Sequence, residues 1–253
     1  MQIVFDRRFH EVYTSDPAAA LGRLGPAEKR LRGLCDFAPA SPARVDDILR
    51  VHTERHLREI RADEVVYDMA MLAAGSALAA ARSALAGEPA FALLRPPGHH
   101  ASPDSCWGFC FFNNVAVALA ALLDEGAIGS ACVLDIDLHF GDGSERIFRS
   151  LDQVEYLHPE GSDRIDYLAA CRSALERARP FDLLAISAGF DRHECDWGGM
   201  LRTGDYEDLG QKARAQAEKH CNGKWFGVLE GGYNPSSLAK STASLLGLSQ
   251  ESG

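Results

Sequence analysis

The stretch ACVLDIDLHFGDG, residues 131–143, decides how the rest of the chain can fold. Its first half is a short apolar run, which predicts a buried β-strand, and two aspartates stand at its end. In an extended chain residues i, i+2 and i+4 share one face, so Asp135, Asp137 and His139 should point together. Two carboxylates at the end of a buried strand repel one another, and burying them is costly without a cation. The stretch therefore predicts a metal site at one edge of a sheet.

The ligand types narrow the choice of metal. Carboxylate and imidazole ligands suit Zn²⁺, and a third protein ligand would leave one position open for water, as catalytic zinc requires. We expect zinc as the cofactor, with Fe²⁺ or Co²⁺ as substitutes. A simpler interpretation stays open for part of the stretch, because Asp142 alone could cap a helix that starts near Ser144.

Short apolar runs alternate with helical patterns along the chain, which is typical of βαβ units and a mainly parallel sheet. The runs predicted as strands are QIVF (2–5), AFALL (90–94), ACVLDID (131–137), QVEYLH (153–158), DLLAISAG (182–189) and WFGVLEGG (225–232). Helices are predicted at 68–87, 113–126, 164–179 and 205–220. We therefore expect an α/β fold, with residues 1–253 forming a single three-layer domain that has helices on both faces of the sheet.

Composition and charge argue against several classes of function. The chain has 253 residues, 46% of them hydrophobic, which is enough to bury a large core. Its formal net charge is −10 and it has no basic run, so we expect no nucleic-acid binding. No stretch of about 18 apolar residues is apparent, so we expect no membrane span and a cytoplasmic location. The seven cysteines lack paired spacing and should be reduced. The oligomeric state stays open.

Polar residues follow four of the predicted strands at their carboxyl ends, where open α/β sheets bind ligands. The segment LRPPGHHA, residues 94–101, places His99 and His100 side by side after a turn that must aim both imidazoles. Asp191 and Tyr233 follow two other strands. We expect these side chains to meet the aspartates of the opening stretch at one rim of the sheet.

Five segments together resemble the histone deacetylase and acetylpolyamine amidohydrolase family. In the order in which the family has them, they are RPPGHHA, GFCFFNNVAVA, DIDLHFGDG, SAGFDRHECDWGG and LEGGYN. The resemblance implies the fold that arginases and deacetylases share. It also implies a zinc-dependent amidohydrolase that removes an acetyl or other acyl group from an amine, such as acetyl-lysine or an acetylated polyamine.

The resemblance implies roles for single residues as well. Asp137, His139 and Asp191 would be the metal ligands, with water in the open position. Tyr233 would donate its hydroxyl to the substrate carbonyl and help to stabilise the oxyanion.

The two adjacent histidines would each have a carboxylate partner of their own. His99 would be the buried imidazole paired with Asp135, and His100 the more solvent-facing one paired with Asp142. The pair would supply the general base and the general acid of the reaction, because separate partners allow their pKa values to differ.

The sequence departs from the family where the family binds substrate. Related enzymes carry a long Gly/Pro/Phe-rich loop after the strand that follows the metal strand, whereas here residues 154–168 pass almost directly into a helix. Phe109, preceded by Gly108, can supply one aromatic wall of an acyl channel. The other wall normally comes from the missing loop, so the channel would be open or completed by another chain.

Two further departures concern ions and charge. Related enzymes hold a structural potassium ion with a serine whose counterpart here is Tyr156, which makes K⁺ binding doubtful, although the backbone carbonyls of Asp137 and His139 remain available. Polyamine-preferring relatives often have an acidic gate residue where this chain has Gly198. That difference weakly disfavours a long cationic substrate.

Two other functions stay open at this stage. Arginases and agmatinases share the general fold but hold two Mn²⁺ ions with an Asp-Ala-His-x-Asp segment, and here Gly141 stands in place of its last aspartate. A catalytically weak relative that only binds acylated ligands is favoured by the shortened loop and disfavoured by the five intact segments.

Overall fold

The computed structural model describes residues 1–248, and its frame is a seven-stranded sheet in which every pairing is parallel. The spatial order of the strands is β2-β1-β3-β7-β6-β4-β5. Their bounds are β1 Gln2–Phe5, β2 Asp36–Pro39, β3 Ala90–Ala92, β4 Ala131–Asp135, β5 Val154–Leu157, β6 Leu183–Ala188 and β7 Trp225–Leu229. The predicted α/β class and parallel sheet are confirmed.

Helices follow the strands as crossover connections require. Their bounds are α1 Gly25–Arg32, α2 Val45–Leu49, α3 Glu54–Arg61, α4 Glu64–Leu85, α5 Asn114–Asp124, α6 Asp142–Phe148, α7 Arg164–Arg177, α8 Thr203–Cys221 and α9 Pro235–Leu245. Each of the four predicted helices is present, with its ends shifted by a few residues at most.

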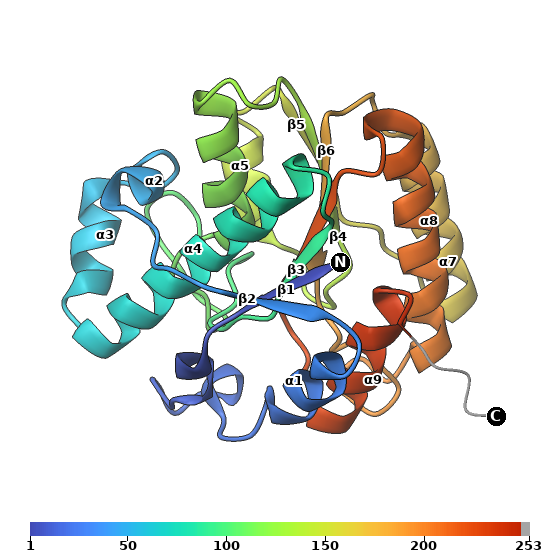
Figure 1. Cartoon of the computed structure of the whole chain (residues 1–253), viewed down its shortest axis with the longest axis horizontal. Helices are drawn as coiled ribbons and strands as arrows, with labels where there is room; N and C mark the ends of the chain where they lie inside the picture. Colours follow the sequence, from blue (N-terminus) through green and yellow to red (C-terminus); the bar gives the residue numbers. More distant parts are fainter. Residues whose placement is uncertain (249–253) are drawn as a thin grey trace.

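The helices form a layer on each face of the sheet (Figure 1). On one face α4 packs across β1, β3 and β7 with α5 alongside it, and α2 and α3 lie on that side. On the other face α8 packs on β6, with α7, α9 and α1 around it. The three-layer arrangement is therefore confirmed. That residues 1–253 form one domain stays a prediction, and residues 249–253 of that range lie outside the described part of the chain.

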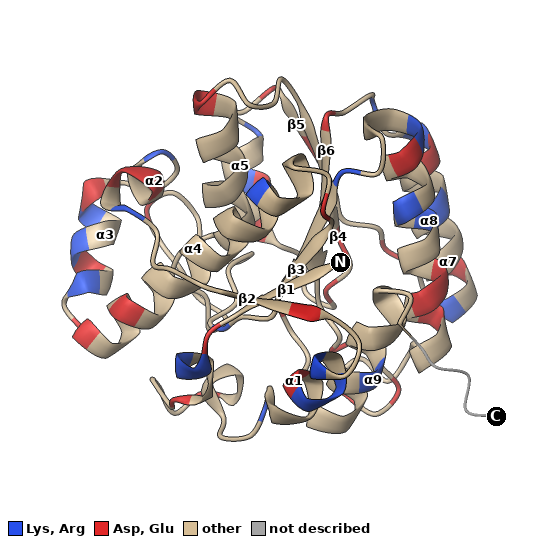
Figure 2. Cartoon of the chain, viewed as in Figure 1, with Lys and Arg blue, Asp and Glu red and all other residues tan. Residues whose placement is uncertain are grey.

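The sheet is buried on both sides, as a parallel sheet covered by two helix layers must be. Every residue of β3, β4, β6 and β7 is buried. Charged residues gather instead on the outer helices, especially α1, α3, α7 and α8 (Figure 2). The four buried strands are neighbours in the order β3-β7-β6-β4, so the loops at their carboxyl ends emerge side by side.

Strand β2 was not predicted. It is a short edge strand that pairs only with β1 among the described strands, and none of its residues DFAP is buried. Proline and aspartate are unusual in strands, and an edge position tolerates them because one side of the strand needs no ladder partner. The segment therefore shows neither the alternation of apolar and polar residues nor the apolar run by which a strand is recognised in a sequence.

Helix α4 corrects an expectation about membranes. Residues 64–85 are long and apolar enough to span a bilayer by length and composition. However, most of the helix is buried, and it packs across three strands. The statement that no such apolar stretch exists was wrong. Burial on both sides, by the sheet and by α5, accounts for the composition of the helix.

Gly75 in the middle of α4 tests this packing. The loop 41–43 crosses the helix there, and a Cβ on Gly75 would lie 2.5 Å from the amide nitrogen of Ala43 and 2.7 Å from the carbonyl carbon of Pro42. We expect Gly75→Ala to lower the free energy of unfolding by about 1–3 kcal/mol through overpacking, although alanine favours an isolated helix by about 1 kcal/mol. Denaturant unfolding would measure the change.

The matched control is Gly204→Ala in the first turn of α8, where no atom lies within 4 Å of the added Cβ. This variant should be neutral or more stable by up to about 1 kcal/mol. If Gly75→Ala proved as stable as the wild type, the close crossing of the loop over α4 would be wrong.

Candidate metal centre and its cavity

The loops that follow β4 and β6 bring three metal-binding side chains together. Asp137 and His139 follow β4, and Asp191 follows β6. One ligand atom from each of the three residues lies within 4.8 Å of the others, and both carboxylates are at most 1% exposed. The three residues expected as ligands from the sequence therefore form one cluster.

Backbone amides fix the orientation of both carboxylates. The amide of His139 donates to Asp137 Oδ1 at 2.9 Å, and the amide of Gly231 donates to Asp137 Oδ2 at 2.8 Å. The amide of Leu138 donates to Asp191 Oδ1 at 3.0 Å. A Cβ on Gly231 would lie 2.5 Å from Asp137 Oδ2 and 2.8 Å from Asp191 Oδ2, so only glycine lets β7 approach this closely.

The remaining oxygen of Asp191 is the clearest sign of a missing ligand. Asp191 Oδ2 is buried and makes no hydrogen bond, although it lies 3.0 Å from His139 Nδ1. A buried carboxylate oxygen without a hydrogen bond is unfavourable. A cation held between Asp137, His139 and Asp191 would supply the interaction that this oxygen lacks, so the donor set fits the predicted metal.

The charges of the cluster are strongly linked. A hydrogen bond with Asp137 and the close carboxylate of Asp191 raise the pKa of His139 to about 10. Burial, together with the charge of Asp137, raises the pKa of Asp191 to about 6. Burial opposes ionisation of Asp137 too, but the charge of His99 and hydrogen bonds from its neighbours outweigh it and lower the pKa of that carboxyl. The cluster as a whole favours a positive charge at its centre.

The histidine pair lies beside this cluster with the predicted partners. His99 Nδ1 is 3.1 Å from Asp135 Oδ2, and His100 Nδ1 is 2.7 Å from Asp142 Oδ1. The hydroxyl of Tyr156 also donates to Asp135 Oδ2, at 2.7 Å. Both pairings expected from the sequence are therefore present in the structure. Both histidines are 3% exposed, but the partner of His100, Asp142, is 40% exposed, whereas the partner of His99, Asp135, is fully buried.

The two histidines differ in their tendency to hold a proton. Burial opposes a charge on His99, but the carboxylates of Asp137 and Asp135 outweigh it and raise the pKa of His99 well above its ordinary value. Burial and the neighbouring charge of His99 lower the pKa of His100 to about 4. At neutral pH one ring therefore carries a proton while the other is free to accept one.

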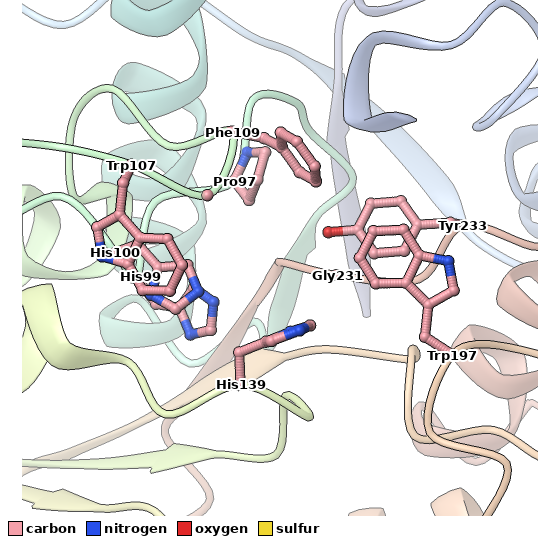
Figure 3. Close-up of a pocket in the computed structure, with 10 residues that line it drawn as sticks. Pro97, His99, His100, Trp107, Phe109, His139, Trp197, Gly231 and Tyr233 are labelled. Carbon is pink, nitrogen blue, oxygen red and sulfur yellow. The ribbon is translucent and has the colours of Figure 1, made fainter. Parts of the chain in front are cut away.

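A cavity of about 130 Å³ opens beside the cluster and the histidine pair. Figure 3 shows the histidines with Trp107 on one side, Tyr233 with Trp197 on the other, and His139 between them. The residues lining the cavity are Pro97, His99, His100, Trp107, Gly108, Phe109, His139, Trp197, Gly231 and Tyr233. Both residues predicted to bind substrate, Phe109 and Gly108, are among them.

The turn that carries Phe109 is shaped by its contact with His100. Gly108 has a φ of 59°, and a Cβ there would lie 2.5 Å from Cδ2 of His100. Phe109 follows with a φ of 67°, which is uncommon for a residue other than glycine. The unusual backbone lets the chain fold over His100 and turn the phenyl ring toward the cavity (Figure 3).

Tyr233 reaches the cavity from the loop after β7, and its hydroxyl points inward (Figure 3). Its backbone amide donates to Asp196 Oδ2 at 2.7 Å, and its ring stacks on Trp197 with centroids 4.0 Å apart. Burial raises the pKa of Tyr233, so the hydroxyl keeps its proton and can act as a donor.

Two tryptophans at the cavity were missed by sequence reasoning. Trp107 stacks on His100 with ring centroids 3.9 Å apart and donates its Nε1–H to Asp142 at 3.0 Å. Trp197 comes from the loop in which Gly198 was expected to mark the gate, but Gly198 does not line the cavity. Trp107 directly precedes the segment GFCFFNNVAVA, and this adjacency is the signal that could have identified it, whereas Trp197 lies within SAGFDRHECDWGG without a pattern that marks its direction.

Two buried charged residues that sequence reasoning did not single out hold the backbone around Tyr233. Glu230 accepts from the amide of Gly98 at 2.7 Å, and burial raises the pKa of Glu230 to about 7. Arg23 donates to the carbonyl oxygens of Gly232 at 2.8 Å and Glu230 at 2.6 Å. Glu230 belongs to the segment LEGGYN, whereas no sequence pattern marks Arg23.

Comparisons with known proteins point to one family. The family model described as "Histone deacetylase domain" matches residues 19–159 and 153–248, two segments that meet where the sequence lacks the long loop. The chain is 33% identical to a "Probable deacetylase" of Archaeoglobus fulgidus over 244 residues, which covers 76% of this chain and 67% of the relative. It is 32% identical to a "Histone deacetylase-like amidohydrolase" of Pseudomonas aeruginosa, with 88% and 75% covered.

A solved structure supports the fold independently. The crystal structure of the "HDA15 HD domain" superposes with a TM-score of 0.81 over 99% of this chain and 90% of that chain, at 24% identity. At this level of identity the likeness concerns the fold alone. Together with the family model and the relatives, it leads to one conclusion: the chain belongs to the histone deacetylase family, as a hydrolase that acts on amide bonds.

Proposed function

We propose that the protein is a zinc-dependent deacetylase that cleaves the amide bond between a short acyl group and an amine, with acetyl-lysine or an acetylated polyamine as its class of substrate. One observation carries the proposal. A cluster of two carboxylates and an imidazole adjoins a small cavity that also receives the histidine pair and the hydroxyl of Tyr233.

The metal would be held by Asp137, His139 and Asp191. Bound there, Zn²⁺ supplies a Lewis acid that polarises the amide carbonyl and lowers the pKa of water. The unpaired Oδ2 of Asp191 and the amide-fixed Asp137 support this assignment. Fe²⁺ or Co²⁺ would fit the same donors.

His100 would act as the general base. Its Nδ1 side pairs with Asp142, which leaves Nε2 free to accept a proton from the attacking water. The low pKa of about 4 keeps the ring neutral and ready to accept that proton at neutral pH. His100 would then return the proton to the leaving amine, while His99 keeps its positive charge beside Asp135.

Tyr233 would stabilise the developing oxyanion. Its protonated hydroxyl faces the cavity and can donate to the carbonyl oxygen as negative charge builds on it. The stacking of Trp197 and the two backbone bonds to Asp196 hold the loop that carries Tyr233.

The cavity favours a short acyl group on an apolar stem. Its volume of about 130 Å³ is well below the roughly 300 Å³ at which drug-sized ligand pockets begin. Trp107, Phe109 and Trp197 would form the walls, so the wall of the missing loop is replaced within the same chain. None of the described residues that line the cavity is acidic, which fits an acylated lysine better than a long polyamine.

The two alternative functions receive less support. Among the described residues, Asp137, His139 and Asp191 form the one group of three side chains that could hold a metal ion. Gly141 stands where an arginase-like site would have its bridging aspartate. A protein that only binds acylated ligands would not need two histidines of opposite protonation and an inward tyrosine hydroxyl.

The metal assignment predicts about one Zn²⁺, Fe²⁺ or Co²⁺ per chain by elemental analysis. A chelator should abolish turnover of an acetyl-lysine substrate, and added Zn²⁺ or Co²⁺ should restore it. Asp191→Ala should lose the metal, whereas Asp142→Asn, which changes a carboxylate outside the triad, should retain it. Two tightly held Mn²⁺ ions per chain would point to the arginase-like alternative.

The assignment of the base predicts that His100→Ala lowers kcat at least about a hundredfold, the usual scale for a general acid–base residue. Metal content should stay the same, because His100 is not in the triad. His10, a partly exposed histidine that pairs with Glu28, provides the control: His10→Ala should keep the wild-type rate. A near-normal rate of His100→Ala with every acyl substrate tried would refute the assignment.

The role of the tyrosine predicts that Tyr233→Phe lowers kcat by about a hundred- to a thousandfold, because it removes a donor needed most in the transition state. Binding of a zinc-chelating hydroxamate should change much less, and Tm should stay the same because phenylalanine keeps the ring stacked on Trp197. Tyr67→Phe is the control, because Tyr67 does not line the cavity. Equal losses of binding and turnover would mean that Tyr233 is structural.

A further inference from the structure

Arg192 is a buried cation that contacts the loop 136–139, which carries the expected metal ligands Asp137 and His139 and is called the metal loop below. It follows Asp191, it is 5% exposed, and none of the ion pairs of the described residues includes it. Burying a charge without a counter-charge is costly, so the guanidinium must find other partners. Its Nε donates to the carbonyl oxygen of Asp137 at 3.1 Å and its Nη2 donates to that of Leu138 at 3.3 Å.

The aromatic ring of Tyr167 completes the surroundings of Arg192. The guanidinium carbon lies 4.3 Å from the centre of this ring, which is within the range of a cation–π interaction. The hydroxyl of Tyr167, a fully buried residue of α7, donates to the carbonyl oxygen of Ile136 at 3.3 Å. Arg192 and Tyr167 together therefore bind the three successive carbonyls of residues 136–138.

The amides of the same loop point to negative charges. The amide of Asp137 donates to Asp135, that of Leu138 to Asp191, and that of His139 to Asp137. The loop is thus held between carboxylates on its N–H side and a guanidinium on its C=O side. Since the loop carries the metal ligands Asp137 and His139, whatever holds its carbonyls also sets the position of the ligands.

Two of the three oxygen groups that a potassium ion would need are already engaged. An alkali cation binds where carbonyl oxygens replace its hydration shell. Here the carbonyl of Asp137 accepts from Arg192, and the hydroxyl of Tyr156, which stands in the place of the usual serine, donates to Asp135. The carbonyl of His139 alone cannot replace a hydration shell, so the residues present do not fit a potassium ion at this loop.

We propose that Arg192 is a positioning residue that serves as a built-in monovalent cation, holding the carbonyls of the metal loop so that metal binding and turnover need no potassium. The proposal rests on the metal centre of the proposed function. It makes Arg192 important for activity although its side chain does not line the acyl cavity.

The neighbourhood of Arg192 allows chemical rescue. A second cavity of about 450 Å³, which shares no lining residue with the acyl cavity, is lined by Leu138, Phe140, His158, Glu160, Gly161, Ser162 and Arg192. Truncating Arg192 would extend this cavity up to the loop carbonyls. A small cation from solvent, guanidinium or K⁺, could then occupy the place of the missing side chain.

The test compares wild type, Arg192→Ala and the exposed control Arg172→Ala in buffers with K⁺, Na⁺ or choline as the sole monovalent cation. Co²⁺ affinity is read from the visible spectrum of the bound ion, and kcat and KM from acetyl-lysine turnover. Wild type and control should give the same values in all three buffers. Arg192→Ala should bind Co²⁺ about 10- to 100-fold more weakly, which is the usual effect of losing a group that orients metal ligands. Its kcat should fall by a larger factor than its KM rises.

Millimolar guanidinium, or K⁺ in place of choline, should recover Co²⁺ affinity in Arg192→Ala and leave the wild type unchanged. A wild type that needs K⁺, or an Arg192→Ala with normal Co²⁺ affinity, would overturn the proposal. If Arg192→Ala fails to fold, the same measurements on Arg192→Lys and on the wild type in the K⁺, Na⁺ and choline buffers still test the proposal. A wild type that binds Co²⁺ but cleaves no acyl substrate would contradict the proposed function alone, since the affinity measurements stand without turnover.

Discussion

Three buried carboxylates, those of Asp135, Asp137 and Asp191, crowd the carboxyl ends of two neighbouring strands, and their mutual repulsion governs the structure around them. Each is at most 1% exposed. Imidazoles, backbone amides and a hydroxyl surround them: His99 and His139 as ring partners, and Tyr156 as a donor. Such an arrangement is stable only while the compensating groups stay fixed, which explains why so many of them come from buried strands and their first loop residues.

The sequence could predict most of this arrangement because the key residues are tied to strand ends. A buried strand is a visible apolar run, and the polar residue that follows it must emerge at the carboxyl edge of a parallel sheet. Asp137, Asp191 and Tyr233 are each within five residues of such a run. Their meeting thus follows from three strands, β7, β6 and β4, being neighbours in the sheet. The pairings of His99 with Asp135 and of His100 with Asp142 needed the family resemblance as well, because they join residues more than 30 positions apart.

What could not be predicted lies in irregular loops and at the edge of the sheet. Trp197 and Gly198 are adjacent in a loop without periodicity, so no pattern tells which of the two faces the cavity. Arg192 contacts carbonyls 54 and 55 positions away, and backbone carbonyls leave no trace in a sequence. Strand β2 exists because β1 offers it a free edge, while its own residues DFAP carry no strand signal. In each case tertiary contacts rather than local preferences decide the outcome.

The two tryptophans at the cavity give the molecule an optical property. The chain has three tryptophans, and the third, Trp225, is buried within β7. Trp107 stacks on His100 and Trp197 stacks on Tyr233, and both are more than half exposed at the mouth of the cavity. A proton taken up by His100, a ligand against the indoles or a coloured ion in the triad would each alter their emission. The intrinsic fluorescence of this protein is therefore largely a signal from its cavity, available without any label.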